Sequence, residues 1–284
     1  MNADAFDTRI CELGEGPLWH PKRQQFFWFD ILGMSLLSRE GDQALEWQFD
    51  EHVSAAGWID HDRLMVASET ALWQFDLSSG EQSFLCALEA ENPVTRSNDG
   101  RADPWGGFWI GTMGKEAEPN AGAIYRYYRG ELRKVAGQIS ISNSICFAPD
   151  RSVAYFTDTP TKTIMRVALE AETGWPTSAP QTHLDLTAFG SGPDGAVTDK
   201  DGNLWLATWG AGAVVCYAPD GTLVQTIKAD AKQTSCPAFG GPNLRDLYIT
   251  SAAVGLEDSG YGRDGCTFVA RDVAQGLPEP RVIL

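Results

Sequence analysis

A short unit recurs six times along the chain, and this repeat constrains the fold more than any other feature of the sequence. Each copy begins with a turn rich in Pro, Asp or Gly and continues into an apolar strand, which carries an aromatic residue in most copies. The spacing of about 40 to 50 residues equals the length of a four-stranded propeller blade. The sequence therefore predicts an all-β, six-bladed β-propeller with four-stranded antiparallel blades around a central channel, in one domain spanning 1–284. The repeated strand segments are 25–30, 63–68, 108–112, 153–158, 204–208 and 247–251.

Four of the copies are followed by a second strand-like segment, at 72–76, 123–127, 163–167 and 213–217. Apolar and polar residues alternate there with period two, which is typical of strands with one buried face. Only 168–172 (Ala-Leu-Glu-Ala-Glu) has a helical pattern, so we expect a short helix at that place. The alternative fold is a large β-sandwich, which would require the repeat to be a coincidence.

Composition limits the partners that the chain can have. Hydrophobic residues make up 43% of the sequence, enough for a large core, and the formal net charge of -16 argues against nucleic acid. The first residues lack the apolar stretch of a signal peptide, and no apolar run approaches the roughly 18 residues that span a bilayer. We expect no nucleic-acid partner, no membrane partner, and a monomer or a weak homo-oligomer.

Six cysteines are scattered along the chain, and no two form a C-x-x-C pair. This spacing excludes a zinc finger and a thioredoxin-like motif. Several lie in apolar strand-like segments, as Cys216 does, so we expect buried free thiols. Free thiols favour a reducing, cytoplasmic location.

Polar residues collect in stretches that precede the apolar strands. The stretch 95–104 holds a cluster of them, and 13–17, 141–145 and 192–195 have a similar placement. Because the blades of a propeller surround one axis, equivalent strand entrances from different blades meet at one mouth of the channel. We therefore expect one shared central site, with these candidate residues: Glu15, Arg96, Asn98, Asn143 and Asp194.

Glu15, Asn143 and Asp194 offer three side-chain oxygens with two formal negative charges. Such a set suits a hard divalent cation such as Ca²⁺, Mg²⁺ or Mn²⁺, with Fe²⁺ and Zn²⁺ as alternatives. Each of the three could also be a simple turn residue. Arg96 and Asn98 could orient a polyol or a carbonyl by hydrogen bonds, or serve as a surface ion pair and a turn.

Other residues of the same stretches have structural explanations. Asp99 and Asp103 are assigned to a turn, with Asp99 as an alternative holder of a metal-bound water. The four histidines show no H-x-x-x-H or H-E-x-x-H spacing, which counts against a histidine-based zinc enzyme. The sequence also lacks a G-x-S-x-G elbow and a Walker or G-x-G-x-x-G motif, so a serine hydrolase and a nucleotide site are unsupported.

The motifs taken together, and in this order, resemble the SMP-30/gluconolactonase/luciferin-regenerating family of six-bladed propellers. Each motif is weak alone, but the ordered set is specific and covers nearly the whole chain. Ser97 departs from the pattern, since many relatives carry an apolar or aromatic residue or a proline there. The matching segments are 13–19, 96–100, 111–113, 147–150, 155–159, 193–195, 201–205 and 239–244, with Asn143.

The resemblance implies that Glu15, Asn143 and Asp194 bind one divalent ion and that Arg96 and Asn98 contact the substrate. It also suggests Glu116 as a contact to substrate hydroxyls. Members of this family mostly open sugar-derived lactones. The resemblance therefore implies a metal-dependent hydrolase that opens an aldonolactone to the aldonic acid, with Asp194 as catalytic base.

Three other functions remain open at this point. The first is a calcium-binding regulatory propeller with a vestigial lactonase site, and the second is a non-enzymatic interaction propeller. The third is a hydrolase that acts on a non-sugar ester or a phosphotriester at the same metal. All but the interaction propeller would use the same candidate residues.

Overall fold

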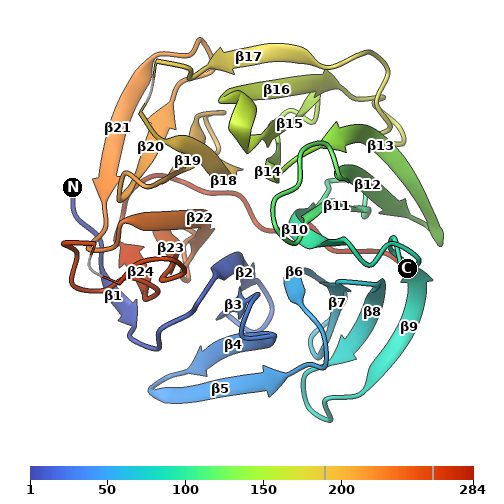
Figure 1. The fold of residues 1–284 in the computed structure, drawn as a ribbon, viewed down its shortest axis with the longest axis horizontal. Helices are drawn as coiled ribbons and strands as arrows, with labels where there is room; N and C mark the ends of the chain where they lie inside the picture. Colours follow the sequence, from blue (N-terminus) through green and yellow to red (C-terminus); the bar gives the residue numbers. More distant parts are fainter. Residues whose placement is uncertain (189, 258) are drawn as a thin grey trace.

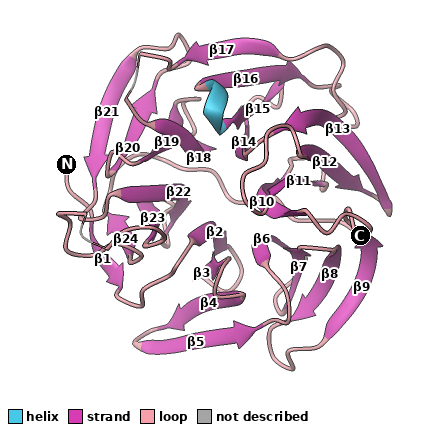
Figure 2. Cartoon of the chain, viewed as in Figure 1, coloured by secondary structure: helices cyan, strands magenta, loops and turns pink. Residues whose placement is uncertain are grey.

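The computed structural model describes residues 1–188, 190–257 and 259–284. Within this part of the chain, 24 β-strands and one short 3-10 helix, η1 (Thr159–Thr161), make up the regular structure (Figure 2). The strands form antiparallel sheets arranged around a central axis (Figure 1). The predicted all-β propeller with four-stranded antiparallel blades is confirmed.

Four blades are separate four-stranded sheets, each with its strands in sequence order from the axis outward. The first contains β2 (Gly14–His20), β3 (Gln25–Asp30), β4 (Ser35–Glu40) and β5 (Gln43–Gln48). The second contains β6 (Val53–Trp58), β7 (Arg63–Ser68), β8 (Ala71–Asp76) and β9 (Gln82–Ala87). The third contains β10 (Thr95–Ala102), β11 (Phe108–Gly114), β12 (Gly122–Tyr128) and β13 (Glu131–Ile139). The fourth contains β14 (Ser142–Phe147), β15 (Val153–Asp158), β16 (Thr163–Ala168) and β17 (Gln181–Asp185).

The other eight strands form one sheet. One half is β18 (Gly192–Thr198), β19 (Leu204–Trp209), β20 (Ala213–Tyr217) and β21 (Leu223–Lys228). The other half is β22 (Gln233–Gly240), β23 (Asp246–Ala252), β24 (Thr267–Ala270) and β1 (Asp4–Asp7). A single residue pair, Trp209 with Gln233, joins the two halves. Strand β1 pairs with β24, so the N-terminal strand completes the sheet of the last strands.

The repeated apolar segment of the sequence is the second strand of each four-stranded unit, namely β3, β7, β11, β15, β19 and β23. These strands are apolar because both of their faces are covered by neighbouring sheets. Trp109 of β11, for example, is fully buried against Ile145 and Phe147 of the next blade. The apolar repeat in the sequence therefore arises from the burial of each second strand between neighbouring blades.

The helix expected at 168–172 is wrong. Ala168 ends β16, and a turn follows in which the Glu170 carboxylate accepts hydrogen bonds from the backbone N–H groups of Glu172 and Thr173. A side chain that binds nearby backbone N–H groups stabilises a turn in place of a helix.

The polar stretches were expected at the entrances of the apolar strands, and most of their length proves to be strand. They form the innermost strands β2, β10, β14 and β18 themselves. Each of the six innermost strands, β6 and β22 included, carries one extra residue relative to the neighbouring strand at a corresponding position. Such a β-bulge changes the direction of adjacent side chains. We call this feature the inner-strand bulge.

The C-terminal segment continues from β24 and crosses the centre of the ring toward the other side (Figure 1). Its residue Val282 is completely buried and donates its backbone N–H to the carbonyl of Trp58. All six cysteines are free thiols, as predicted, and five of them are buried. Within the described residues, no helix has the length and apolar character needed to cross a membrane.

Candidate functional site

The three predicted metal ligands lie in three different inner strands. Glu15 is in β2, Asn143 in β14 and Asp194 in β18, and each lies at or next to the inner-strand bulge. Their exposed fractions are only 4%, 3% and 4%. Burial of such polar groups is costly unless they are hydrogen bonded or bind a ligand, so their contacts decide what the site can do.

Glu15 and Asp194 lie close together, and each carboxyl group affects the pKa of the other. Burial and the negative charge of Asp99 raise the pKa of Glu15 to about 8. Burial, and then the charges of Glu15 and Asp99, raise the pKa of Asp194 well above its usual range. Carboxylates this close cannot all ionise without a compensating positive charge.

Asn143 joins this pair through a chain of hydrogen bonds. Its Oδ1 accepts from Asn98 Nδ2 at 3.1 Å, and its Nδ2 donates to Thr159 Oγ1 at 2.9 Å. Thr159 Oγ1 in turn donates to the carbonyl of Pro193 at 2.9 Å, next to Asp194. These contacts fix the orientation of the Asn143 amide and connect it to the strand that carries Asp194.

Asn98 and Arg96 lie together on β10, as expected for a pair that acts jointly. Arg96 Nη1 donates to Asn98 Oδ1 and to the Ser97 carbonyl, both at 2.8 Å. Asn98 Nδ2 donates to the Ser142 carbonyl at 2.9 Å as well as to Asn143. Nε and Nη2 of Arg96 have no hydrogen-bond partner among the described residues, so these donors are available to a ligand.

Arg96 is 5% exposed. Burial lowers the pKa of Arg96 to about 10, and the charges of Glu15 and Glu69 oppose that shift. A pKa of about 10 leaves Arg96 protonated at neutral pH. The site therefore combines one arginine cation with a group of carboxylates.

Asp99 belongs to the site rather than to a turn. Its Oδ2 accepts a hydrogen bond from the Ile145 N–H at 2.7 Å, and burial raises the pKa of Asp99 to about 6. The side chain is 3% exposed and acts electrostatically on both Glu15 and Asp194. The only signal in the sequence was its position directly after Asn98.

Asp103, by contrast, has the turn role that was predicted. Its Oδ1 accepts hydrogen bonds from the N–H groups of Trp105 and Gly107, both at 2.9 Å. Its other oxygen, Oδ2, accepts from Nε of the fully buried Arg126 at 2.6 Å.

Glu116 lies on the exposed loop between β11 and β12. Within the described residues no contact joins its carboxylate to the buried group. Its neighbour Lys115 forms an ion pair with Glu69, and the other oxygen of Glu69 bonds to His52 Nδ1 at 2.7 Å. This network comes from loops of three different blade regions, so local sequence patterns could not predict it.

The opposite end of the channel is closed by Arg101 and Glu279, which form a buried ion pair. The Arg101 guanidinium also reaches carbonyl groups on three further inner strands, those of Ile145 at 3.3 Å, Ala196 at 3.4 Å and Pro237 at 3.5 Å. One side chain thus links four inner strands and the C-terminal segment. Its positive charge opposes the rise in the pKa of Asp99 that burial causes.

The donor set fits a hard divalent cation. Within the described residues, no three or more His, Cys, Asp or Glu side chains gather as a ready cation site. The predicted ligands are instead two carboxylates and one amide oxygen, and water completes such sets around Ca²⁺ or Mg²⁺. Of the two arginines near Glu15, Asp99 and Asp194, Arg101 is already paired with Glu279, which leaves Arg96. Three carboxyls thus face one unpaired arginine, so a positive charge between Glu15 and Asp194 would be stabilised.

The molecule is thus a β-propeller with a buried group of carboxyl, amide and guanidinium side chains at one end of its channel. The chain belongs to the SMP-30/Gluconolactonase/LRE-like family, whose family model matches residues 13–253. The resemblance read from the sequence motifs is confirmed.

Individual relatives match over almost the whole chain. An L-arabinolactonase of Azospirillum brasilense is 35% identical, with 97% of this chain and 93% of the relative covered. A 6-deoxy-6-sulfogluconolactonase of Pseudomonas putida is 33% identical, with 94% of each chain covered. The crystal structure of regucalcin from Agrobacterium tumefaciens, a calcium-binding protein, has a TM-score of 0.97 at 37% identity. It covers 100% of this chain and 98% of that one.

Proposed function

We propose that the chain is a divalent-cation-dependent lactonase that hydrolyses a sugar-derived lactone to the open hydroxy acid. The observation that carries the proposal is the proximity of Glu15 to Asp194, two buried carboxyls from different blades beside the Asn143 amide. The substrate class is supported by two relatives, which are named as an L-arabinolactonase and a 6-deoxy-6-sulfogluconolactonase. Each is about one third identical to this chain over nearly its whole length.

Arg96 and Asn98 hold the substrate in this proposal. The Nε and Nη2 donors of Arg96 suit hydroxyl or carbonyl oxygens of a sugar lactone, since a guanidinium presents its donors in a fixed fork. Asn98 Oδ1 accepts one hydrogen bond from Arg96 and has capacity for a second, from a substrate hydroxyl. These contacts fix the ring so that water can approach the carbonyl.

Asp194 is the proposed base. It accepts the proton of the attacking water, and that proton later passes to the ring oxygen that leaves as a hydroxyl. Glu15, Asn143 and Asp194 would hold the cation, which when bound supplies the Lewis acidity that stabilises negative charge on the carbonyl oxygen. Ca²⁺, Mg²⁺, Mn²⁺, Fe²⁺ and Zn²⁺ are the candidates. Glu116, on the loop between β11 and β12, would contact substrate hydroxyls.

The finer architecture belongs to the same proposal. We infer six blades in a single domain, with the eight-stranded sheet counted as two blades because one residue pair alone joins its halves. The free thiols support a reducing, cytoplasmic setting. We also infer that the protein is a monomer or a weak homo-oligomer and that its partner is a small molecule.

A second candidate is a calcium-binding protein without hydrolytic activity. The high similarity to a calcium-binding regucalcin supports it, and the same side chains would hold the ion. Hydrolysis of a non-sugar ester or a phosphotriester is a further alternative that uses the same base. These alternatives predict different substrates, or none, so an activity assay distinguishes them.

The test is a pH-indicator assay with glucono-, xylono-, arabinono- and galactonolactone, plus a simple aryl ester and a phosphotriester. The protein is first treated with a chelator, and each metal is then added back singly. We expect lactone hydrolysis that disappears with chelator and returns with metal, and that is almost absent in Asp194→Ala and Asn143→Ala. Full activity in Asp194→Ala would rule out this assignment, and metal binding without any turnover would favour the calcium-binding alternative.

A further inference from the structure

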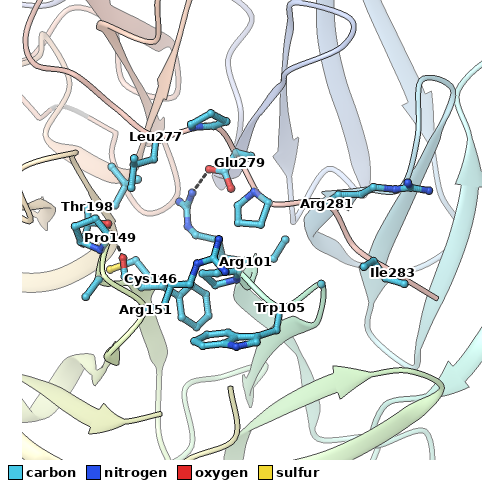
Figure 3. A pocket seen from close by; sticks show the side chains of 18 residues that line it. Arg101, Trp105, Cys146, Pro149, Arg151, Thr198, Leu277, Glu279, Arg281 and Ile283 are labelled. Carbon is cyan, nitrogen blue, oxygen red and sulfur yellow. Dashed lines mark hydrogen bonds and ion pairs between the residues drawn. The ribbon is translucent and has the colours of Figure 1, made fainter. Parts of the chain in front are cut away.

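A cavity of about 520 Å³ lies at the end of the channel opposite the candidate site (Figure 3). It is bounded by the ends of β10, β14 and β18 and by the C-terminal segment 277–283. None of the five buried candidate residues lines it. Its inner end is the Arg101–Glu279 pair, which separates it from the carboxylates above. The cavity is therefore distinct from the proposed lactonase site.

The walls of the cavity are mainly apolar. A volume of this size falls within the range of roughly 300–1000 Å³ that small-molecule sites occupy, and apolar walls with a few polar groups are typical of such sites. Figure 3 shows Trp105 and Arg151 on one side and the segment from Leu277 to Ile283 on the other. The apolar wall residues include Phe147, Pro149, Val197, Leu277, Pro278 and Ile283.

The charge available in the cavity is positive, although the whole chain carries a net charge of -16. Glu279 is the acidic residue of the lining, and it is neutralised by Arg101. Arg281 turns away toward the second blade, where its Nε donates to the Ile59 carbonyl. The Arg151 guanidinium has no ion-pair or hydrogen-bond partner among the described residues. A ligand that enters the cavity thus meets one uncompensated cation.

The backbone at Arg151 makes this side chain easy to test. Its φ angle is +64°, in the left-handed region that side chains other than glycine's rarely adopt. The turn between β14 and β15 would accept glycine there with less strain. Glycine at this position therefore removes the guanidinium without adding backbone strain.

We propose that this cavity binds a small organic anion with a flat apolar body. The apolar body packs between Trp105 and the wall formed by Pro149 and Leu277, and the anionic group pairs with Arg151. Trp105 is held for this contact by a hydrogen bond from its Nε1 to the Ala171 carbonyl at 2.9 Å. The proposal is independent of lactone hydrolysis at the other end of the channel.

The probes are 2-naphthoate and its uncharged counterpart 2-naphthol, each titrated into the full chain by isothermal titration calorimetry. We expect one saturable naphthoate site that binds at least tenfold more tightly than naphthol. Arg151→Gly should weaken naphthoate at least tenfold, leave naphthol unchanged, and leave the melting temperature equal or higher. Leu277→Glu, which places a negative charge on the half-exposed wall, should also weaken naphthoate.

Two matched variants complete the experiment. Gln24→Gly changes another left-handed residue in the corresponding turn of the first blade, away from the cavity, and should leave naphthoate binding unchanged. Asp194→Asn should also leave it unchanged, which separates this site from the lactonase site. The proposal fails if the native protein shows no saturable naphthoate binding, if Arg151→Gly binds naphthoate as tightly as the native chain, or if Asp194→Asn abolishes binding.

Discussion

Arg101 and Glu279 form a buried ion pair between the innermost strand of the third blade and the C-terminal segment, 178 positions apart in the chain. The Glu279 carbonyl also accepts a hydrogen bond from Trp58 Nε1 at 2.8 Å. The second and third blades and the end of the chain are thus joined by Glu279.

Removing the charge of Glu279 should therefore destabilise the whole fold. Glu279→Gln leaves the Arg101 cation buried without its partner, and breaking such a pair costs about 3–5 kcal/mol. Urea unfolding followed by tryptophan fluorescence measures the loss. The exposed pair of Arg133 with Glu131 provides the control, because Glu131→Gln should have no measurable effect. Equal stability of the two variants would contradict a structural role for Glu279.

Asn98 should control cation binding although it is not a proposed ligand. Its amide holds the Asn143 oxygen in place, and loss of such a supporting hydrogen bond typically lowers metal affinity about 10- to 100-fold. Calorimetric titration of Asn98→Ala with Ca²⁺ or Mn²⁺ checks this. Asn92→Ala, in the exposed loop before β10, should keep the native affinity. An unchanged affinity in Asn98→Ala would show that Asn143 needs no support.

Arg96 should act mainly on substrate binding. Arg96→Ala removes the two free donors, and we expect lactone kcat/KM to fall roughly 10- to 100-fold, which corresponds to about one hydrogen bond to a charged group. Arg96→Lys keeps the charge without the planar fork and should recover only part of the loss. Steady-state kinetics on the preferred lactone decide this. Native kinetics in Arg96→Ala would exclude a substrate contact.

His20 should make stability depend on pH. The side chain is fully buried, its Nε2 bonds to the Asp60 carbonyl at 2.8 Å, and its Nδ1 accepts from the Arg23 N–H at 3.2 Å. Burial lowers the pKa of His20 in the folded protein, whereas the unfolded chain takes up a proton near pH 6.5. The free energy of unfolding should therefore fall as the pH drops below about 6.5.

The contribution of His20 is measured by comparing variants. In His20→Gln, the difference in unfolding free energy between about pH 7.5 and pH 5.5 should be smaller than in the native chain. If His20→Gln retains the native slope, a different group causes the dependence.

The thiols should differ in reactivity. Burial raises the pKa of Cys11 to about 12 and that of Cys236 well above its ordinary value, so neither forms a thiolate at neutral pH. Cys86 on the outer strand β9 is only half-buried, with a pKa raised to about 11. A thiol reagent should label Cys86 first in the folded protein, and Cys86→Ser should remove this early phase. Rapid labelling of all six without denaturant would contradict the packing.

The second strands of the blades were predictable because they are buried on both faces. Residues 25–30, 63–68 and 153–158 coincide with β3, β7 and β15 to the residue. The inner strands could not be recognised in the same way. One face of β10 or β14 lines a polar channel, so a strand such as Thr95–Ala102 shows no regular alternation and resembles a turn in the sequence.

The proposed site residues could be selected from sequence, but their partners could not. Glu15, Asn143 and Asp194 stand in motifs, whereas the contact of Asn98 with Asn143 depends on how two blades are placed. The role of Asp99 in raising the pKa of Glu15 likewise arises only when β10 and β2 share one channel. Glu279 had no motif at all, because an isolated glutamate near the end of a chain carries no local signal.

The inner-strand bulge carries different side chains in different blades. The first residue within it is Asp194 in β18, and the corresponding residues of β6 and β22 are the buried serines Ser54 and Ser235. Both serine hydroxyls bond to the neighbouring inner strand, that of Ser54 to Ser97 Oγ at 2.8 Å and that of Ser235 to the Gly14 carbonyl. The same backbone irregularity therefore carries a carboxylate in one blade and fastens adjacent blades to each other in two others.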